Sequence, residues 1–379
     1  MQRLKIGLVL DDTLDTPDGV QQYVLAVGGW LAGQGHDVHY LVGETKRSDL
    51  LNVHSLSRNV KVKFNGNRMS MPLPAGKRHL RAFLEREKFD VLHVQVPYSP
   101  LLAGRLLAVA PRATAVVGTF HILPYSRLVT LANRGLALLN RRSGRRFDAR
   151  LAVSAPAAEF ARQVYGYHAV VLPNPIDTKK YLGASSKSRD LTIVFLGRLV
   201  ERKGAQHLLA AIAYLCEHHL YTGNFRVYIG GKGELLASLE QYVQAHDLAK
   251  IVTFEGFIDE AKKPGFLAQA DIAVYPSTSG ESFGIVLLEA MAAARGVVLG
   301  GDNPGYASVL APLAQNQLID PKNTAEFAHT LAAWLDNAAG RQAAATAQKK
   351  YVRQYDVVTV GQELVKIYTE ALRRRRKMR

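Results

Sequence analysis

The sequence contains few of the features that mark secreted, disulfide-bonded or membrane-spanning proteins. It has one cysteine, Cys216, so no disulfide can form within the chain, and a reducing compartment is expected. No apolar run approaches the roughly 20 residues needed to cross a bilayer. The first such run, Ile6 to Leu10, is too short for the core of a signal peptide. We therefore expect a cytoplasmic protein that is soluble or peripheral to a membrane.

Acidic residues are also scarce: 32 Asp and Glu stand against 48 Lys and Arg, which gives a net charge of +16. An excess of this size predicts an anionic partner. The basic residues gather in segments 77–88, 127–150 and 373–379, where in the first two they alternate with leucine and phenylalanine. This mixture, poor in other aromatic residues, favours an anionic membrane surface over a nucleic-acid groove. A solvated charged face is the simpler alternative for any one segment.

Apolar runs alternate with helical patterns in two successive sets, and this order is typical of parallel sheets built from βαβ units. The expected strands of the first set are Lys5–Leu10, His36–Leu41, Val91–Gln95, Ala115–Phe120 and Arg150–Val153. Those of the second set are Leu191–Leu196, Phe225–Ile229, Ile251–Phe254, Ile272–Tyr275 and Val297–Leu299. The order predicts an α/β protein with two Rossmann-like domains, 1–172 and 173–355, and an active-site cleft between them. A last helix in 356–379 is expected to return to the first domain and to end in the basic tail.

The segment Gly280–Glu289 is the most informative motif in the chain. It follows the expected strand Ile272–Tyr275, so Glu281 should lie in the loop after that strand. A helix expected from Phe283 places Glu289 about two turns inside it. Ligands of such sheets bind at the carboxyl ends of the strands, where the first N–H groups of a helix suit a phosphate. We therefore expect Glu281 to meet a polar sugar and Glu289 a ribose; two unrelated surface glutamates are the simpler alternative.

A cationic loop follows the strand Leu191–Leu196. Arg198 and Lys203 in this loop are predicted to grip a diphosphate, the first as a planar fork and the second as a point charge, with Arg202 between them. The same pair would stabilise the charge that grows on a leaving phosphate oxygen. Weaker signals are the glycine turn around Gly231, whose amides suit a phosphate, and the loop 258–263, which suits a nucleoside base.

The first domain offers two candidates. Gly19 opens the helix that follows the first strand, so its backbone can lie against a phosphate or a sugar. His121 follows the strand Ala115–Phe120 and is placed to bond a sugar hydroxyl or a phosphate. A histidine with a purely structural role is the alternative for His121.

Taken together, these residues resemble the retaining glycosyltransferases of the GT-B fold, and most of all the bacterial phosphatidylinositol α-mannosyltransferases. The likeness covers nearly the whole chain and includes Phe89–His93, Gly118–His121, Gly280–Val286 and Glu289–Ala293. Two departures concern the acceptor side. Asp12 stands where these enzymes carry an aromatic acceptor contact, and Asp18 stands where a glycine is usual.

The resemblance implies a role for each matched residue. The implied catalytic residues are Glu281, Arg198, Lys203 and His121. The implied donor site comprises Gly19, Arg202, Gly231, Ile258, Asp259, Glu260, Lys263, Ser282, Phe283, Gly284, Ile285 and Glu289. The implied acceptor contacts are Asp12, Gln21 and Asn65, and the implied membrane contacts are Lys77, Arg78 and Arg81.

The expected activity is the transfer of mannose from GDP-mannose to a lipid headgroup such as phosphatidylinositol, with retention, at the inner face of the plasma membrane. No cofactor or metal is expected, because cations and helix amides face the diphosphate and no Asp-x-Asp element stands in the donor segments. The sequence offers no convincing second carboxylate for a double displacement, which favours front-face transfer. The alternatives are a UDP-glucose type of donor with a diacylglycerol or soluble acceptor, a GT-B sugar-nucleotide epimerase and, as the weakest, a nucleic-acid-binding protein.

Overall fold

The computed structural model describes residues 2–16, 18–64, 67–95, 97–124, 127–139, 143–183, 190–313 and 317–377. The chain forms two compact units, which we call unit 1 (Met1–Pro175 with Val357–Arg379) and unit 2 (Ile176–Asp356). The chain thus passes from one unit to the other twice, after Pro175 and before Val357. The α/β class and the two parallel sheets predicted from the sequence are confirmed.

Unit 1 is built on a seven-stranded parallel sheet with the order β3-β2-β1-β6-β7-β8-β9. Its strands are β1 (Lys5–Leu10), β2 (Asp37–Val42), β3 (Val53–Ser55), β6 (Val91–Val94), β7 (Ala115–Phe120), β8 (Ala149–Ala152) and β9 (Val170–Val171). Its helices are α1 (Gly19–Gly33), α2 (Lys77–Glu87), α3 (Leu102–Val109), α4 (Arg127–Leu139), η1 (Ser143–Arg146), α5 (Ala155–Tyr165) and α13 (Val357–Lys377). Leu8 packs on one face of the sheet with α1 and α13, and Val9 packs on the other with α2 and α3.

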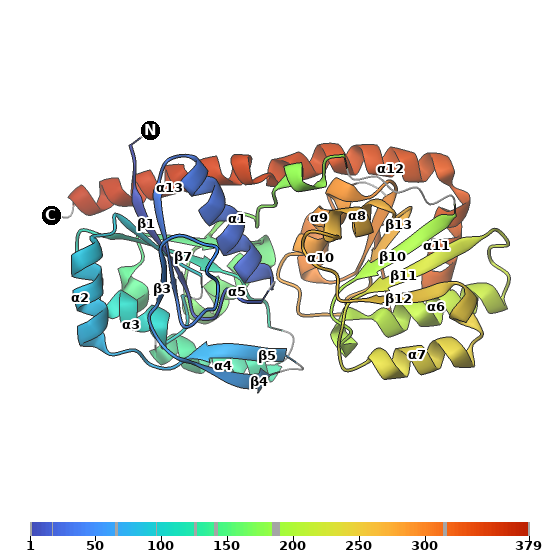
Figure 1. Ribbon diagram of the computed structural model, residues 1–379, viewed down its shortest axis with the longest axis horizontal. Helices are drawn as coiled ribbons and strands as arrows, with labels where there is room; N and C mark the ends of the chain where they lie inside the picture. Colours follow the sequence, from blue (N-terminus) through green and yellow to red (C-terminus); the bar gives the residue numbers. More distant parts are fainter. Residues whose placement is uncertain are drawn as a thin grey trace. The chain divides into compact units, whose positions relative to one another are not determined.

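Two features of unit 1 go beyond a simple alternation of strands and helices. An antiparallel hairpin of β4 (Asn59–Phe64) and β5 (Asn67–Pro72) precedes α2. The last helix, α13, lies beside α1 in Figure 1, and Gly361 allows it to approach, because a Cβ there would meet the ring of Trp30 at 2.3 Å. The helix α13 therefore belongs to unit 1, together with the residues up to Pro175.

Unit 2 contains a six-stranded parallel sheet with the order β12-β11-β10-β13-β14-β15. Its strands are β10 (Leu191–Leu196), β11 (Phe225–Gly230), β12 (Val252–Gly256), β13 (Ile272–Tyr275), β14 (Val297–Gly301) and β15 (Leu318–Ile319). Its α-helices are α6 (Ala205–Glu217), α7 (Leu236–Ala245), α8 (Lys263–Ala268), α9 (Ile285–Ala293), α10 (Pro304–Leu310), α11 (Thr324–Asp336) and α12 (Ala338–Tyr351). Four short 3₁₀ turns complete the described part of this unit: η2 (Thr178–Tyr181), η3 (Glu201–Lys203), η4 (Leu248–Lys250) and η5 (Val352–Tyr355).

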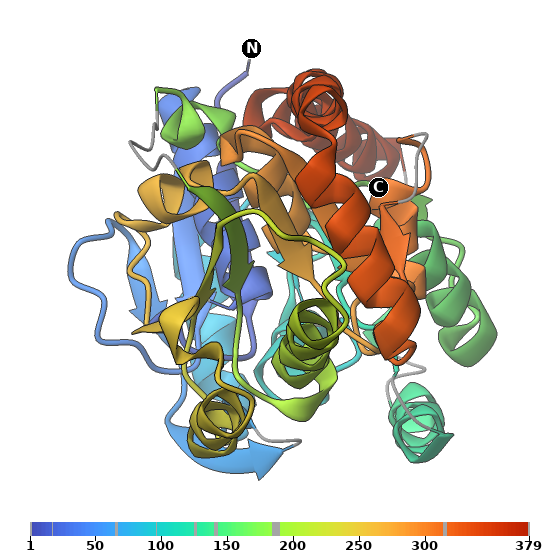
Figure 2. The same ribbon diagram turned by 90° about the vertical axis from the view of Figure 1, so that its right-hand side faces the viewer.

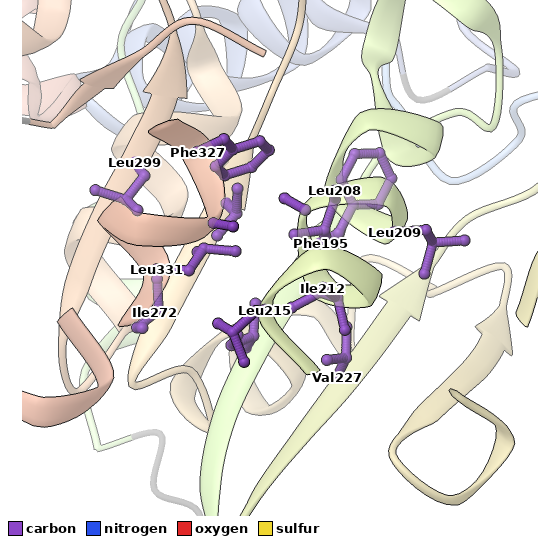
Figure 3. Packing of buried hydrophobic residues seen from close by; sticks show 14 of the residues in the cluster. Phe195, Leu208, Leu209, Ile212, Leu215, Val227, Ile272, Leu299, Phe327 and Leu331 are labelled. Atoms are coloured by element: carbon purple, nitrogen blue, oxygen red, sulfur yellow. The ribbon is translucent and has the colours of Figure 1, made fainter. Parts of the chain in front are cut away.

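The core of unit 2 fills the space between its sheet and the helices α6 and α11. Figure 2 shows these two helices on one face of the sheet, and they contact each other directly. In Figure 3, Leu208 and Ile212 of α6 face Phe327 and Leu331 of α11 above strand residues such as Ile272. Aliphatic burial of this extent anchors the strands, so the loops at their carboxyl ends start from fixed points.

Each sheet has one point at which the strand order reverses, between β1 and β6 in unit 1 and between β10 and β13 in unit 2. Loops that leave neighbouring strands at such a point diverge to opposite faces and open a crevice at the carboxyl edge. The loops after β10 and β13 contain Arg198–Lys203 and Ser277–Glu281, and the loop after β1 contains Asp11–Asp18. The candidates in these three loops therefore lie at the switch points of their sheets, whereas His121, Gly231 and the loop 258–263 follow β7, β11 and β12.

Candidate active site

In unit 2, the loops after β10 and β13 are bonded to each other. The carbonyl oxygen of Arg202 accepts a hydrogen bond from the N–H of Thr278, at 2.9 Å, and one from the hydroxyl of Ser277, also at 2.9 Å. Gly204 follows with φ +79°, and a Cβ there would meet the carbonyl oxygen of Pro276 at 2.0 Å. Only glycine permits this approach, so the two loops form one rigid platform.

Glu281 is the centre of this platform, and we call it and its partners the Glu281 cluster. Arg202 Nη1 and Lys203 Nζ each lie 2.8 Å from Glu281 Oε1, and the Ser277 hydroxyl donates to the same oxygen at 2.9 Å. The three charged side chains are 12–20% exposed. Burial alone would raise the pKa of Glu281, but Lys203 and Arg202 outweigh it, so the pKa lies below its ordinary value and the carboxylate is ionised at neutral pH.

Arg198 is half-buried and belongs to the same electrostatic environment. Burial lowers the pKa of Lys203, Glu281 opposes this, and the nearby charges of Arg202 and Arg198 lower it further. We take Lys203 as charged, because its ammonium contacts an ionised carboxylate at hydrogen-bond distance. The cluster thus places two cations on one carboxylate, with the charge of Arg198 acting on Lys203, and an anionic ligand would relieve the repulsion among the cations.

The glycine turn after β11 packs against the cationic loop backbone to backbone. A Cβ on Gly231, which has φ +143°, would meet the carbonyl oxygen of Gly197 at 1.8 Å, and one on Gly233 would meet that of Leu199 at 2.1 Å. The N–H of Gly231 donates to the carbonyl of Gly256 at 2.6 Å. The Gly231 amide is therefore already bonded, and the glycine is required for close packing of the two loops.

The helix α9 begins at Ile285, two residues after the expected start. Phe283 is buried against Tyr355, while Ser282 is half-buried. Gly284 precedes the helix with φ +129°, a conformation that few other residues adopt, and no side chain caps the first turn. The first N–H groups of a helix of this kind attract an anion.

Glu289 lies inside α9 and forms a second centre, the Glu289 cluster. Lys263 Nζ donates to Glu289 Oε1 at 2.8 Å, and the hydroxyl of Tyr181 donates to the same oxygen at 3.0 Å. Lys263 also contacts Glu260 at 2.6 Å. Burial raises the pKa of Glu289, and Lys263 opposes the shift. The cluster contains two carboxylates and one ammonium, so its net charge is opposite in sign to that of the Glu281 cluster.

The remaining donor-side candidates lie close to Lys263 in the chain. The carbonyl of Asp259 accepts hydrogen bonds from the N–H groups of Lys262 and Lys263, both at 2.9 Å, and so closes the turn before α8. Ile258 is half-buried and its side chain approaches the position that a Cβ on Gly230 would occupy. Asp259 itself is exposed.

In unit 1, His121 follows β7 and is buried, with 8% of its surface exposed. Its Nε2 lies 2.9 Å from Gln95 Oε1, and Gln95 Nε2 donates to the His93 carbonyl at 3.5 Å. Because the amide nitrogen of Gln95 is used by that carbonyl, its oxygen faces His121, whose Nε2 therefore carries the proton. Burial lowers the pKa of His121 to about 3, so the ring is neutral and Nδ1 is left as an acceptor.

Asp12 and Gln21 also meet in unit 1. The carboxylate of Asp12 accepts a hydrogen bond from the N–H of Thr13 at 2.7 Å and interacts with the buried Gln21 side chain of α1. Burial raises the pKa of Asp12 to about 6, and the charge of Asp18 contributes to the same direction. Gly19 is the exposed first residue of α1. Asn65, the third expected acceptor contact, lies outside the described residues.

The basic segments differ in what they expose. Lys77, Arg78 and Arg81 are exposed on α2, but apolar residues of the same helix, such as Leu80 and Phe83, are buried in the core of unit 1. Of these side chains, only the cations face outward. In the tail, Arg375 is held at 2.6 Å from Asp148 of unit 1 and is only 18% exposed, so this arginine anchors α13.

Several residues of these clusters were not identified from the sequence. Tyr181, Gln95 and Ser277 supply side-chain bonds to Glu289, His121 and Glu281, respectively. Asn303 holds the loop after β13 through a bond from Nδ2 to the carbonyl of Ser277, at 2.9 Å. Gly305 lies so close to that loop that a Cβ would meet the carbonyl oxygen of Glu281 at 2.0 Å. Of these residues, only Asn303 and Gly305 lie in a recognisable pattern, because the sequence Asn303-Pro304-Gly305 is typical of the capped start of a helix.

Among the described residues, no helix is both long and apolar enough to span a membrane. Within the same residues, no group of three or more His, Cys, Asp or Glu side chains is placed to hold a metal ion.

Comparison with known proteins gives a consistent result for both units. Residues 179–352 match the family described as Glycosyl transferases group 1, and residues 17–180 match Glycosyltransferase Family 4. The phosphatidyl-myo-inositol mannosyltransferase of Mycolicibacterium smegmatis is 30% identical over 96% of this chain and 93% of its own. That of Propionibacterium freudenreichii is 35% identical over 78% of this chain and 76% of its own.

Solved structures support the fold. A glycosyltransferase from Rickettsia africae has a TM-score of 0.75 at 15% identity and covers 98% of this chain and 99% of its own. Anabaena HepE, solved with UDP and glucose, has a TM-score of 0.71 at 17% identity and covers 96% of this chain and 99% of its own. The chain therefore belongs to the GT-B glycosyltransferases of the group 1 family, together with the phosphatidyl-myo-inositol mannosyltransferases, and is a hexosyltransferase.

Proposed function

We propose that the chain transfers mannose from GDP-mannose to the inositol headgroup of phosphatidylinositol, with retention of configuration, at the cytoplasmic surface of the plasma membrane. The names of its relatives suggest the sugar and the acceptor. The single observation that carries the proposal is the pair of clusters around Glu281 and Glu289, at the loop and helix that follow β13.

The two clusters suit two different parts of a nucleotide sugar, the diphosphate with its hexose and the ribose. In the Glu281 cluster, Lys203, Arg202 and the nearby Arg198 would neutralise the diphosphate, helped by the amides from Phe283 to Ile285 at the start of α9. In the Glu289 cluster, the carboxylate would accept a hydrogen bond from the ribose. Glu281 would orient the hexose beside the diphosphate. Because protein cations supply the neutralising charge, we propose that no metal is required.

The proposed chemistry is front-face transfer. The bond between the sugar C1 and the phosphate oxygen breaks while a bond from C1 to the acceptor oxygen forms on the same face, and the acceptor proton passes to the leaving phosphate. Lys203 and Arg198 would stabilise the charge that develops on that phosphate. On the side of unit 1, the neutral His121 would accept a hydrogen bond from the sugar at Nδ1, and Asp12, Gln21 and Gly19 would border the acceptor.

One observation favours a second acceptor. Asp11, Asp12 and Asp18 place their carboxylates near one another, and burial raises the pKa of both Asp11 and Asp12 to about 6. At neutral pH this region is negative, which opposes a phosphate in direct contact with it but suits the hydroxyls of a polyol. A neutral glycolipid or diacylglycerol acceptor is therefore the second candidate.

The test is transfer of labelled sugar from GDP-mannose, with UDP-glucose in parallel, into vesicles that contain phosphatidylinositol, phosphatidylglycerol or diacylglycerol. Label in phosphatidylinositol from GDP-mannose, unchanged by EDTA, is the expected result. Label from UDP-glucose or in another lipid would overturn the specific assignment, and loss of activity in EDTA would overturn metal independence. Proton NMR of the product determines whether the anomeric configuration is retained.

The membrane part of the proposal rests on the exposed cations of α2 and has its own test. Replacement of Lys77, Arg78 and Arg81 by serine should weaken sedimentation with anionic vesicles by about 100-fold, because each cation near such a surface contributes about a factor of five. The matched control replaces three exposed lysines of unit 2, Lys250, Lys349 and Lys350. Equal losses in both triple variants would show that net charge alone, and not α2, determines the binding.

A further inference from the structure

Tyr181 contacts one of the two motif glutamates although it lies far from the motif in sequence. It ends the 3₁₀ turn η2, is 7% exposed, and donates its hydroxyl proton to Glu289 Oε1 at 3.0 Å. The two residues are 108 positions apart. A buried hydrogen bond over such a separation is specific, because both partners must be brought to it by the fold.

The bond determines how the Glu289 carboxylate is turned. Lys263 Nζ and the Tyr181 hydroxyl both reach Oε1, at 2.8 and 3.0 Å. A carboxylate with two donors on one oxygen presents its other oxygen, Oε2, to a further donor. The ammonium of Lys263 also contacts Glu260 and lies at the end of a flexible side chain. It therefore stabilises the charge of Glu289 but does little to fix the orientation of its carboxylate. The rigid ring of Tyr181 is the better candidate to fix the angle.

The position of Tyr181 is itself fixed. The Asp177 side chain caps η2 by accepting a hydrogen bond from the N–H of Lys179. Thr178 is bonded through its N–H and its hydroxyl to the carboxylate of Asp356, and Ile176 donates its N–H to the carbonyl of Tyr355 at 2.9 Å. The turn that presents Tyr181 is thus tied to a second segment of unit 2, and the phenol has little freedom to follow a displaced carboxylate.

We propose that Tyr181 is a positioning residue for the donor: it holds Glu289 so that Oε2 accepts a hydrogen bond from a ribose hydroxyl of the bound nucleotide. The inference rests on the proposed function, in which Glu289 meets the ribose. A purely structural tyrosine would stabilise unit 2 without affecting how the protein distinguishes ribose from deoxyribose. The two roles therefore differ in one measurable quantity, the selectivity for the ribose hydroxyls.

The experiment measures binding of GDP, 2′-deoxy-GDP and 3′-deoxy-GDP, and of the matching uridine set, to the full chain by calorimetry. A hydrogen bond to an ionised group is worth about tenfold or more in affinity. The unaltered protein should therefore prefer the ribonucleotide of one set over one deoxy form by about tenfold. In Tyr181→Phe this preference should fall to about twofold, with affinity for that deoxy form unchanged.

Tyr351→Phe is the matched control, because it removes a partly buried hydroxyl of the same unit that bonds Tyr355. It should keep the tenfold preference, and thermal unfolding of both variants checks their fold. Full ribose selectivity in Tyr181→Phe, or an equal loss of affinity for the ribo and deoxy forms, overturns the inference and leaves the proposed function standing. If the unaltered protein does not distinguish ribose from deoxyribose in either set, Glu289 is not the ribose ligand, and the proposed function falls with the inference.

Discussion

Replacement of Glu281 by glutamine tests how the cationic loop works. The change keeps the shape of the side chain and removes only its charge. In the structure Lys203, Arg202 and Ser277 all converge on Glu281 Oε1, and the carboxylate side chain is 12% exposed. The variant therefore leaves two cations facing a neutral amide. Glu281→Ala would also create a gap, so it is the less informative change.

The expected loss of stability follows from the burial of the pair. Breaking a fully buried ion pair costs about 3–5 kcal/mol, whereas an exposed pair contributes about 1 kcal/mol or less. Lys203 and Arg202 keep 18% and 20% exposure, so solvent screens part of the interaction. We expect a loss of about 2 kcal/mol in the free energy of unfolding. For a unit of this size that lowers Tm by about 4–8 °C.

Glu281→Gln should affect nucleotide binding and sugar transfer in opposite directions. Without the carboxylate, Lys203 and Arg202 no longer have an internal anion, so affinity for GDP should stay equal or rise. Transfer of the hexose should fall by about 100-fold or more, since in the proposed function Glu281 orients the reacting sugar. Calorimetric titration with GDP, thermal unfolding and transfer of labelled mannose measure the three quantities. Glu240→Gln, at an exposed position on α7, is the control.

The pH dependence gives a further check on the same variant. The folded pKa of Glu281 is lowered, so its contribution to stability is complete above the unfolded value of about 4.3 and is lost as pH falls through the folded pKa. The difference in Tm between the unaltered protein and Glu281→Gln should therefore be largest at neutral pH and shrink in acid. An unchanged Tm together with unchanged turnover would refute the role given to Glu281, and weaker GDP binding would refute the competition for the cations.

Three further predictions concern the residues around the motifs. Asp12→Asn should raise the free energy of unfolding above pH 6 and lose this advantage toward pH 4, because the folded pKa of Asp12 is raised to about 6. Asp15→Asn should instead destabilise the protein at neutral pH, because the pKa of the Asp15 carboxylate is lowered. Unfolding measured across pH 4–8 distinguishes the two variants. Gln95→Leu should lower kcat by about tenfold, because the hydrogen bond that fixes the tautomer of His121 is lost. Gln95→Glu should raise the pKa of His121 and so add an acidic limb to the pH–rate profile. A flat profile in Gln95→Glu would contradict this account. Gly305→Ala should destabilise unit 2 by about 1–3 kcal/mol, because the added Cβ would press on the backbone of Glu281. The control is Gly265→Ala, which should leave Tm nearly unchanged because no atom lies within 4 Å of the added carbon.

The fold could be predicted where long apolar runs form central strands. The expected limits of Leu191–Leu196 and Ile272–Tyr275 agree with β10 and β13, because strands buried on both faces give continuous runs. Short edge strands such as β9, which is only Val170–Val171, lack such a signal. The hairpin of β4 and β5 was also missed: its strands mix Val and Met with Lys and Arg, so they lack the continuous apolar runs from which the central strands were identified.

The site residues could be predicted only where they lie close together in the sequence. Glu281 and Glu289 belong to one motif, and their positions in a loop and in α9 follow from the strand before them. Tyr181 and Gln95 bond their partners across 108 and 26 residues, so no window of sequence contains both ends of either bond. The apolar side chains of α2 illustrate another limit of the sequence pattern. A helix that mixes cations with leucine is amphipathic in either setting, and the pattern does not say whether its apolar face meets a membrane or its own domain's core.

The two motif glutamates look alike in sequence, yet the structure gives them opposite surroundings. Glu281 faces two cations, whereas Glu289 shares one ammonium with Glu260. A nucleotide sugar is asymmetric in the same way, because its doubly charged diphosphate and its hexose lie on one side of an uncharged nucleoside. In the proposed orientation the diphosphate meets the net positive cluster and the ribose meets the net negative one, while the reverse orientation would bring phosphate against two carboxylates. We therefore expect the charge difference between the clusters to favour this direction of the donor. Lys203→Glu, which reverses the sign of one charge in the positive cluster, should weaken nucleotide binding far more than Lys203→Met, which only removes that charge.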